Sequence, residues 1–221
     1  MRRILFAVAV AVATCSASTA YAHQGNPNME SVVRTVTPKT AGISLDVLGR
    51  DDRFLLTNRS DKTVVIYGYN DDQYARLLPD GTVQVNKRSP AYFLNDDRYA
   101  DITVPASADA DAPAQWTTLD KTGRFQWHDH RMHYMARGVP PSVKDKSKRQ
   151  RIFNYEIPVQ IGAKSGDIAG TLFWNPEPDG GPPVAAIVAF VVIVAASITA
   201  VVVTRRLRAA GPAEPRSKDS W

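Results

Sequence analysis

Cysteine is almost absent from this chain of 221 residues. Cys15 is the only one, and it lies close to the N-terminus. The rest of the chain can therefore form no disulfide and offers no thiolate as a nucleophile or metal ligand. A domain without disulfides depends on its hydrophobic core, and this chain is long enough to bury one.

The common signatures of enzymes are also absent from the sequence. It contains no glycine-rich phosphate loop, no Gly-x-Ser-x-Gly elbow and no His-Glu-x-x-His motif. A serine triad needs a histidine that a carboxylate orients. Asp129 lies between two histidines, but on a strand it would point to the opposite face. We therefore expect no catalytic residue, and a binding protein rather than an enzyme.

Long hydrophobic runs are few, and the first is short. Arg2 and Arg3 precede an apolar run from Ile4 to Thr14, and residues 20–22 read Ala-Tyr-Ala. A basic start, a short apolar run and a small-x-small end are typical of a cleaved export signal. The run is too short to cross a bilayer, which takes about 20 apolar residues. Residues 1–22 are therefore predicted to be a signal peptide, with an uncleaved anchor as the alternative.

The second run, residues 184–204, is long enough to cross a bilayer. It is apolar throughout and carries no charge, and Arg205, Arg206 and Arg208 follow it. Basic residues beside a span stay in the cytoplasm. We expect a single-pass protein of the cell membrane, with its N-terminal domain outside and residues 205–221 as a cytoplasmic tail. The lipid bilayer is then the partner of residues 184–204.

Basic charge is concentrated at the two ends of the chain. Seven of the 27 basic residues but two of the 22 acidic residues lie in residues 1–22 and 205–221. The exterior part is therefore balanced in charge, despite the high isoelectric point of the whole chain. This balance does not favour a nucleic-acid partner.

Between the two runs, short alternating segments predict strands and no helix. Residues 23–40 have the composition of an exposed lead-in, and residues 176–183 that of a linker. Apolar and polar residues alternate from Ile43 to Val47 and from Phe153 to Ile161. Two hairpins are predicted, at residues 74–85 and 116–128, from turn residues between β-rich segments. We expect residues 41–175 to form an antiparallel, immunoglobulin-like β-sandwich in an all-β exported domain, with a small barrel as the alternative.

Three of the four histidines lie in residues 127–134, at the end of the second hairpin. On a strand His128 and His130 point to the same face, whereas His133 joins them only if the chain bends or bulges after His130. Such a pair can present two imidazoles to one metal ion. It can equally hydrogen-bond two polar rings at the rim of a sheet. Asp129 with Arg131, or with Arg98, is then more typical of a salt bridge that holds a loop.

Cleavage after Ala22 would make His23 the first residue of the mature chain. Its free amine and its imidazole could then chelate one metal ion, and copper suits such nitrogen ligands best. Met132 and Met135 could add a thioether, although methionine is more often filler in a core. The candidate metal ligands are therefore His128, His130, His133 and His23, and copper is the favoured ion.

The layout of signal, exported β-domain, single span and basic tail resembles uncharacterised membrane-anchored proteins of the bacterial envelope. A mature chain that starts at His23 and carries later histidines also resembles periplasmic copper-resistance proteins of the copper-carrier type. Residues 24–27 depart from the opening pattern of that family. Two functions follow as hypotheses: a binding or interaction module with an envelope protein as its partner, and copper binding or handover at the cell surface.

Overall fold

The computed structural model describes residues 26–176 and 184–209. The chain divides into two compact units, Met1–Glu177 and Pro178–Trp221. The predicted signal peptide, His23 and most of the linker and tail lie outside the described residues.

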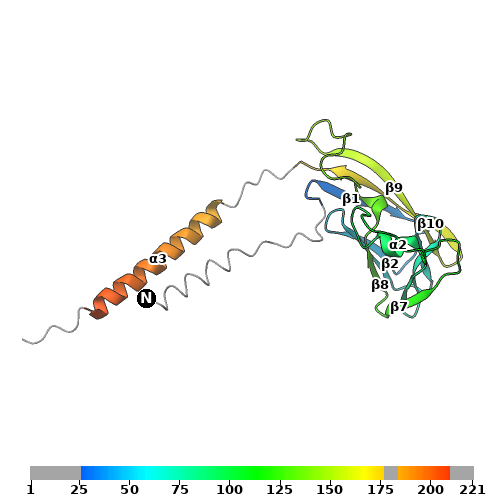
Figure 1. Cartoon of the computed structure of the whole chain (residues 1–221), viewed down its shortest axis with the longest axis horizontal. Coiled ribbons are helices and arrows are strands. Elements are labelled where there is room, and N and C mark those ends of the chain that lie inside the picture. The colour runs from blue at the N-terminus through cyan, green and yellow to red at the C-terminus, as the bar shows by residue number, and fades with distance from the viewer. Residues whose placement is uncertain (1–25, 177–183, 210–221) are drawn as a thin grey trace, which may run out of the picture. The chain divides into compact units, whose positions relative to one another are not determined.

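The first unit is built from two antiparallel sheets (Figure 1). The larger sheet has seven strands in the order β1-β10-β9-β4-β5-β6-β7, and the smaller has three in the order β2-β3-β8. The ten strands are β1 (Met29–Val36), β2 (Ile43–Leu48), β3 (Arg53–Asn58), β4 (Val64–Tyr67), β5 (Gln73–Leu77), β6 (Val83–Asn86), β7 (Trp116–Asp120), β8 (Arg124–Trp127), β9 (Gln150–Ile161) and β10 (Lys164–Trp174).

One hydrophobic core lies between the sheets. In β3 and β8 every second residue is buried, which is the period that the sequence predicts for half-buried strands. Phe54 and Trp127 of the small sheet share this core with Ile66, Ile157 and Ile168 of the large sheet. The prediction of a mostly β domain with antiparallel sheets is confirmed.

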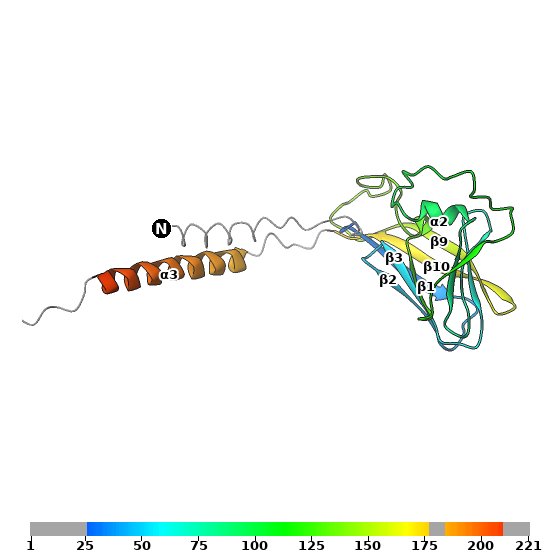
Figure 2. The ribbon, with the colours of Figure 1, turned by 60° about the horizontal axis from the view of Figure 1, so that its bottom comes forward.

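The long hairpin of β9 and β10 forms one side of the large sheet, with β1 as the edge strand beside β10 (Figure 2). Met29 at the start of β1 pairs with Trp174 at the end of β10. Just beyond them, Asn175 N donates to Asn28 O at 2.7 Å. The described chain therefore enters and leaves this unit at the same end.

Three local predictions differ from the structure. Residues 116–128 do not form a hairpin, because β7 pairs with β6 in the large sheet whereas β8 pairs with β3 in the small one. Part of the expected lead-in forms β1, with Met29 and Ser31 buried. A short helix, α2 (Pro90–Leu94), follows β6, and Pro90 fits its first turn because the missing N–H would have no partner there.

The second unit contains helix α3 (Val184–Ala209). Its segment Ile187–Ala209 is long and apolar enough to cross a membrane, and an 18-residue window within it has a mean hydropathy of 2.8. Three hydroxyls along it, including those of Ser197 and Thr199, donate to carbonyls four residues earlier. These bonds satisfy the polar groups within the helix itself, as hydrocarbon surroundings require.

Candidate metal centre

Strand β8 leads into residues 127–134, the histidine segment, which lies at the edge of the core. Phe125 and Trp127 point inward, with ring centroids 5.5 Å apart and planes 11° from parallel. The strand ends at Trp127, and a single 3₁₀ turn, η1 (His130–Met132), follows. Asp129 starts this turn, because its side chain accepts the Arg131 N–H at 3.1 Å. The turn is the bend after His130 that His133 needs in order to join the other two rings.

The three rings gather into a histidine triad, His128, His130 and His133. One ring nitrogen of each lies within 4.8 Å of those of the other two. A point within about 2.8 Å of all three nitrogens therefore exists, to compare with metal–nitrogen bonds of about 2.0 Å. His128 and His133 are buried, and His130 is half-buried.

Each ring of the triad also has a backbone carbonyl behind it. His128 Nδ1 faces Asp52 O, His130 Nε2 lies 2.8 Å from Asp97 O, and His133 Nδ1 lies 3.1 Å from Tyr134 O. A carbonyl oxygen can only accept, so a ring that bonds its carbonyl carries the ring proton on that nitrogen. In that tautomer the orienting carbonyls, as we call them, leave lone pairs on His128 Nε2, His130 Nδ1 and His133 Nε2. Carbonyls behind metal-binding histidines fix the tautomer in the same way.

Two of these nitrogens face each other at close range. His128 Nε2 and His133 Nε2 are 2.8 Å apart. At that distance one nitrogen donates a hydrogen bond to the other in the metal-free chain, and a metal ion bound between them would replace that proton. The same feature makes the triad a strong candidate for a metal site.

Burial favours the neutral form of two of the imidazoles, His133 and His130. It lowers the pKa of His133 to about 3, and the nearby His128 and Arg98 add to the effect. Burial also lowers the pKa of His130, against the carbonyl of Asp97, which raises it. A neutral ring keeps the lone pair that a metal ion needs, so protons compete weakly for these two residues.

A buried ion pair holds the segment in place beside the triad. Arg131 binds both carboxylate oxygens of Asp129 at 2.8 Å, and Trp127 Nε1 donates to the same carboxylate at 3.1 Å. Arg131 also donates to the carbonyls of Tyr67 and Gly68 at 3.0 and 3.1 Å. The alternative that Asp129 and Arg131 form a loop-holding salt bridge is confirmed.

An aromatic ring supports the half-buried member of the triad. Tyr69 stacks on His130 with centroids 5.6 Å apart and planes 17° from parallel. Its hydroxyl accepts the His130 N–H at 3.0 Å. Because the hydroxyl also donates to Asn95, Tyr69 links His130 to the chain after α2.

The structure thus brings together three of the four predicted ligands, and His23 lies outside the described residues. Met132 is part of the hydrophobic core, which confirms its interpretation as filler, and Met135 is exposed. Sequence reasoning missed Asp52, Asp97 and Tyr69, which support the rings. Asp52 and Asp97 contribute through their backbone carbonyls, and no side-chain pattern in a sequence reports a backbone contact.

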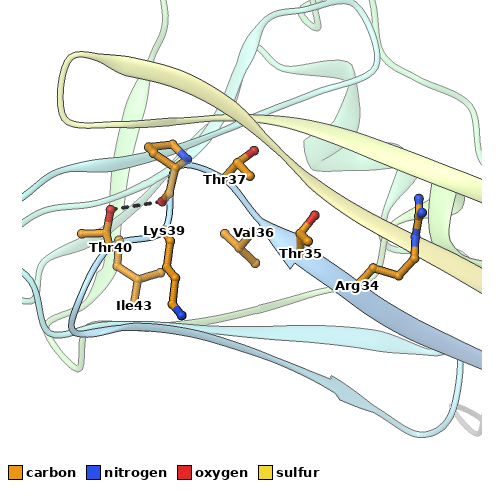
Figure 3. Close-up of a pocket in the computed structure, with 8 residues that line it drawn as sticks. Arg34, Thr35, Val36, Thr37, Lys39, Thr40 and Ile43 are labelled. Carbon is orange, nitrogen blue, oxygen red and sulfur yellow. Dashed lines mark hydrogen bonds between the residues drawn. The ribbon is translucent and has the colours of Figure 1, made fainter.

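Three hollows on the described part of the domain surface are lined by residues other than the triad. A hollow of about 430 Å³ beside the end of β1 is lined by three threonines, two cations and aliphatic side chains (Figure 3). Its floor includes a bond from Thr40 Oγ1 to Pro38 O at 3.1 Å. It holds no cluster of titratable groups comparable with the triad, so the triad remains the candidate site.

Comparison with known proteins adds no further assignment. No family model, curated protein or solved structure matches this chain.

Proposed function

We propose that this protein is a membrane-anchored binding module of the cell envelope whose exterior domain binds a transition metal ion through the histidine triad. The observation that carries the proposal is the convergence of three imidazole rings, each with one nitrogen within 4.8 Å of those of the other two and each with a backbone carbonyl bonded to a ring nitrogen. A hydrogen-bonded rim of rings would not need all three rings to bring a nitrogen toward one point.

Copper is the ion that the site favours, with zinc as its competitor. Imidazole nitrogen suits both ions, and Cu²⁺ binds a given nitrogen site more tightly than Zn²⁺ does. Among the described residues no cysteine, aspartate or glutamate joins the triad as a further ligand. A three-nitrogen site leaves room for a further ligand on either ion, which is typical of exchangeable rather than purely structural sites.

The exterior position of the domain is part of the same proposal. Helix α3 supports it as a membrane span, and Arg205, Arg206 and Arg208 at its end favour a cytoplasmic tail. The immunoglobulin-like arrangement of the two sheets is likewise proposed, on the basis of their shared core. An envelope protein that delivers or receives the ion would be the partner.

Titration of the purified full chain with Cu²⁺ and Zn²⁺ tests the proposal. We expect one ion per chain, bound with micromolar or tighter affinity, and a large loss of affinity in the double variant His128→Ala/His130→Ala. His23→Ala tests the fourth candidate ligand separately, because it removes the remaining histidine and leaves the triad intact. Equal, weak binding by the native chain and the double variant would show that the triad serves structure alone.

A further inference from the structure

The orienting carbonyls come from separate parts of the chain. Asp52 lies in the turn between β2 and β3, and Asp97 lies in the segment that follows α2. The lone pairs of His128 and His130 can converge only if these two segments keep a fixed separation. The contact that fixes this separation therefore controls the metal site.

One arginine joins the two segments. Arg98, which directly follows Asp97, donates from Nη2 to Asp51 Oδ2 at 2.6 Å. Its Nη1 lies 3.4 Å from both Asp51 O and Asp52 Oδ1. The same Asp52 oxygen is 3.6 Å from His128 Nδ1. A single guanidinium thus contacts the residue that orients His128 and is bonded in sequence to the residue that orients His130.

The surroundings of Arg98 and Asp51 hold this ion pair in a fixed geometry. The Asp51 side chain is fully buried, and 18% of the Arg98 side chain is exposed. Burial raises the pKa of the Asp51 carboxyl, and the charge and hydrogen bond of Arg98 counteract that rise. Asp51 Oδ1 is held from its other side by Asn26 N at 2.9 Å. A planar guanidinium with several donors fixes such a geometry better than an ammonium group does.

We propose that Arg98 is the positioning residue of the metal site: its contacts with Asp51 and Asp52 hold the two segments together so that the lone pairs of His128 and His130 converge. This inference rests on the proposed function, because the site it assembles is the histidine triad. Arg98 itself binds no metal.

The charge of Arg98 and its position have opposite effects on metal affinity. As a cation it lowers the pKa of His133, and by the same repulsion it disfavours a metal ion. If charge were its only effect, Arg98→Gln would tighten binding and Arg98→Lys would leave it unchanged. If Arg98 positions the rings, both variants weaken binding.

Titration of the full chain and its variants with Cu²⁺ separates these effects. We expect both Arg98→Gln and Arg98→Lys to lose about 10- to 100-fold in affinity, as changes behind the ligands usually do. Arg149→Gln is the matched control and should bind as the native chain does. Arg149 also bonds a carboxylate, Glu30 at 2.9 Å, and contacts none of the residues behind the triad. Unchanged or tighter binding in either folded Arg98 variant would overturn the inference.

A second measurement needs no metal. Long-range ¹H–¹⁵N spectra of the metal-free chain report which nitrogen of each ring carries the proton. We expect His130 in the Nε2–H form in the native chain, and a mixture of forms in both Arg98 variants, because the Asp97 carbonyl is no longer held. An unchanged His130 form in the variants would contradict the positioning role. A native chain that binds no metal but shows this change would refute the proposed function and leave the positioning role standing.

Circular dichroism of each variant shows whether it is folded, so that unfolding is not mistaken for a loss of positioning. If Arg98→Gln fails to fold, Arg98→Lys keeps a positive charge beside Asp51 and decides the question alone.

Discussion

Asp129 and Arg131 are the residues on which the local shape of the histidine segment depends. Asp129 starts the 3₁₀ turn, and its carboxylate also accepts from Trp127 and from both sides of the Arg131 guanidinium. The turn brings His133 back beside His128. A change at Asp129 should therefore affect the fold and the metal site together.

Asp129→Asn tests this dependence. The variant keeps the size of the side chain but leaves Arg131 as a largely buried charge without its carboxylate, a change that costs about 3 kcal/mol in comparable buried pairs. We expect the free energy of unfolding, measured by urea denaturation, to fall by about that amount. Asp145→Asn breaks the exposed pair with Lys148 and serves as the control, with no measurable change expected. Equal stability of the two variants would contradict the account.

The lowered pKa values of His133 and His130 predict how the stability of the metal-free chain depends on pH. Unfolding returns His133 to its usual pKa near 6.5, whereas in the folded protein its pKa is about 3. Between these values the unfolded state binds more protons, so the stability contributed at neutral pH is lost as the pH falls from about 6.5 to about 3.

Comparison of the native chain with His133→Gln isolates this effect from the carboxylates, which also titrate in acid. We expect the difference in unfolding free energy between the two to shrink steadily over that pH range, in chemical denaturation with a chelator present. A difference that stays constant from pH 7 to pH 4 would show that His133 titrates normally.

At the scale of the elements, the close approach of β9 and β10 depends on Gly170. A Cβ added at this residue would lie 2.1 Å from the Tyr155 ring on the paired strand. Tyr155 is buried, and its hydroxyl bonds Ser31 of β1 at 2.7 Å. Gly170 thus allows the tyrosine on β9 to bond β1 across the intervening strand β10.

Gly170→Ala should therefore destabilise the domain by overpacking. We expect a loss of about 1–3 kcal/mol in the free energy of unfolding, because the ring has to move out of its place. A double-mutant cycle with Tyr155→Ala identifies the cause: once the ring is gone, the added methyl group should cost much less. A cost that is the same with and without Tyr155 would place the effect elsewhere.

The sequence predicts the strands better than their partners. The alternation in residues 43–47 and 153–161 is local, and the structure has strands there. The turn residues 120–123 are also local, but they are compatible either with pairing of the flanking strands or with their divergence into two sheets. Contacts between distant residues, with β6 for β7 and with β3 for β8, decide between these outcomes.

In the candidate site, too, the sequence predicts the features that depend on neighbouring residues and not those that depend on distant contacts. The scarcity and spacing of the histidines identify the triad, since three of four lie within eight residues. The 3₁₀ turn that recruits His133 depends on an Asp129 contact that a strand pattern hides. Arg98 and Asp51 are 47 residues apart, and no periodic pattern joins them.

At the scale of the whole molecule, the account requires the β-domain and the tail to lie on opposite sides of a membrane. Because Cys15 is the only cysteine, single cysteines can be introduced as labels. In intact cells, Lys121→Cys in the turn between β7 and β8 should react with a membrane-impermeant maleimide. Ser217→Cys in the tail should react only after permeabilisation. The reverse pattern would place the domain in the cytoplasm.

The measurement that tests the central claim most directly is X-ray absorption at the metal edge of the copper-loaded full chain, which counts the coordinated imidazoles. The account predicts three imidazole rings at about 2.0 Å in the native chain, and the loss of that signal when His128, His130 and His133 are replaced together. A native spectrum without imidazole, or an unchanged spectrum in the triple variant, would show that the converging lone pairs hold no metal ion.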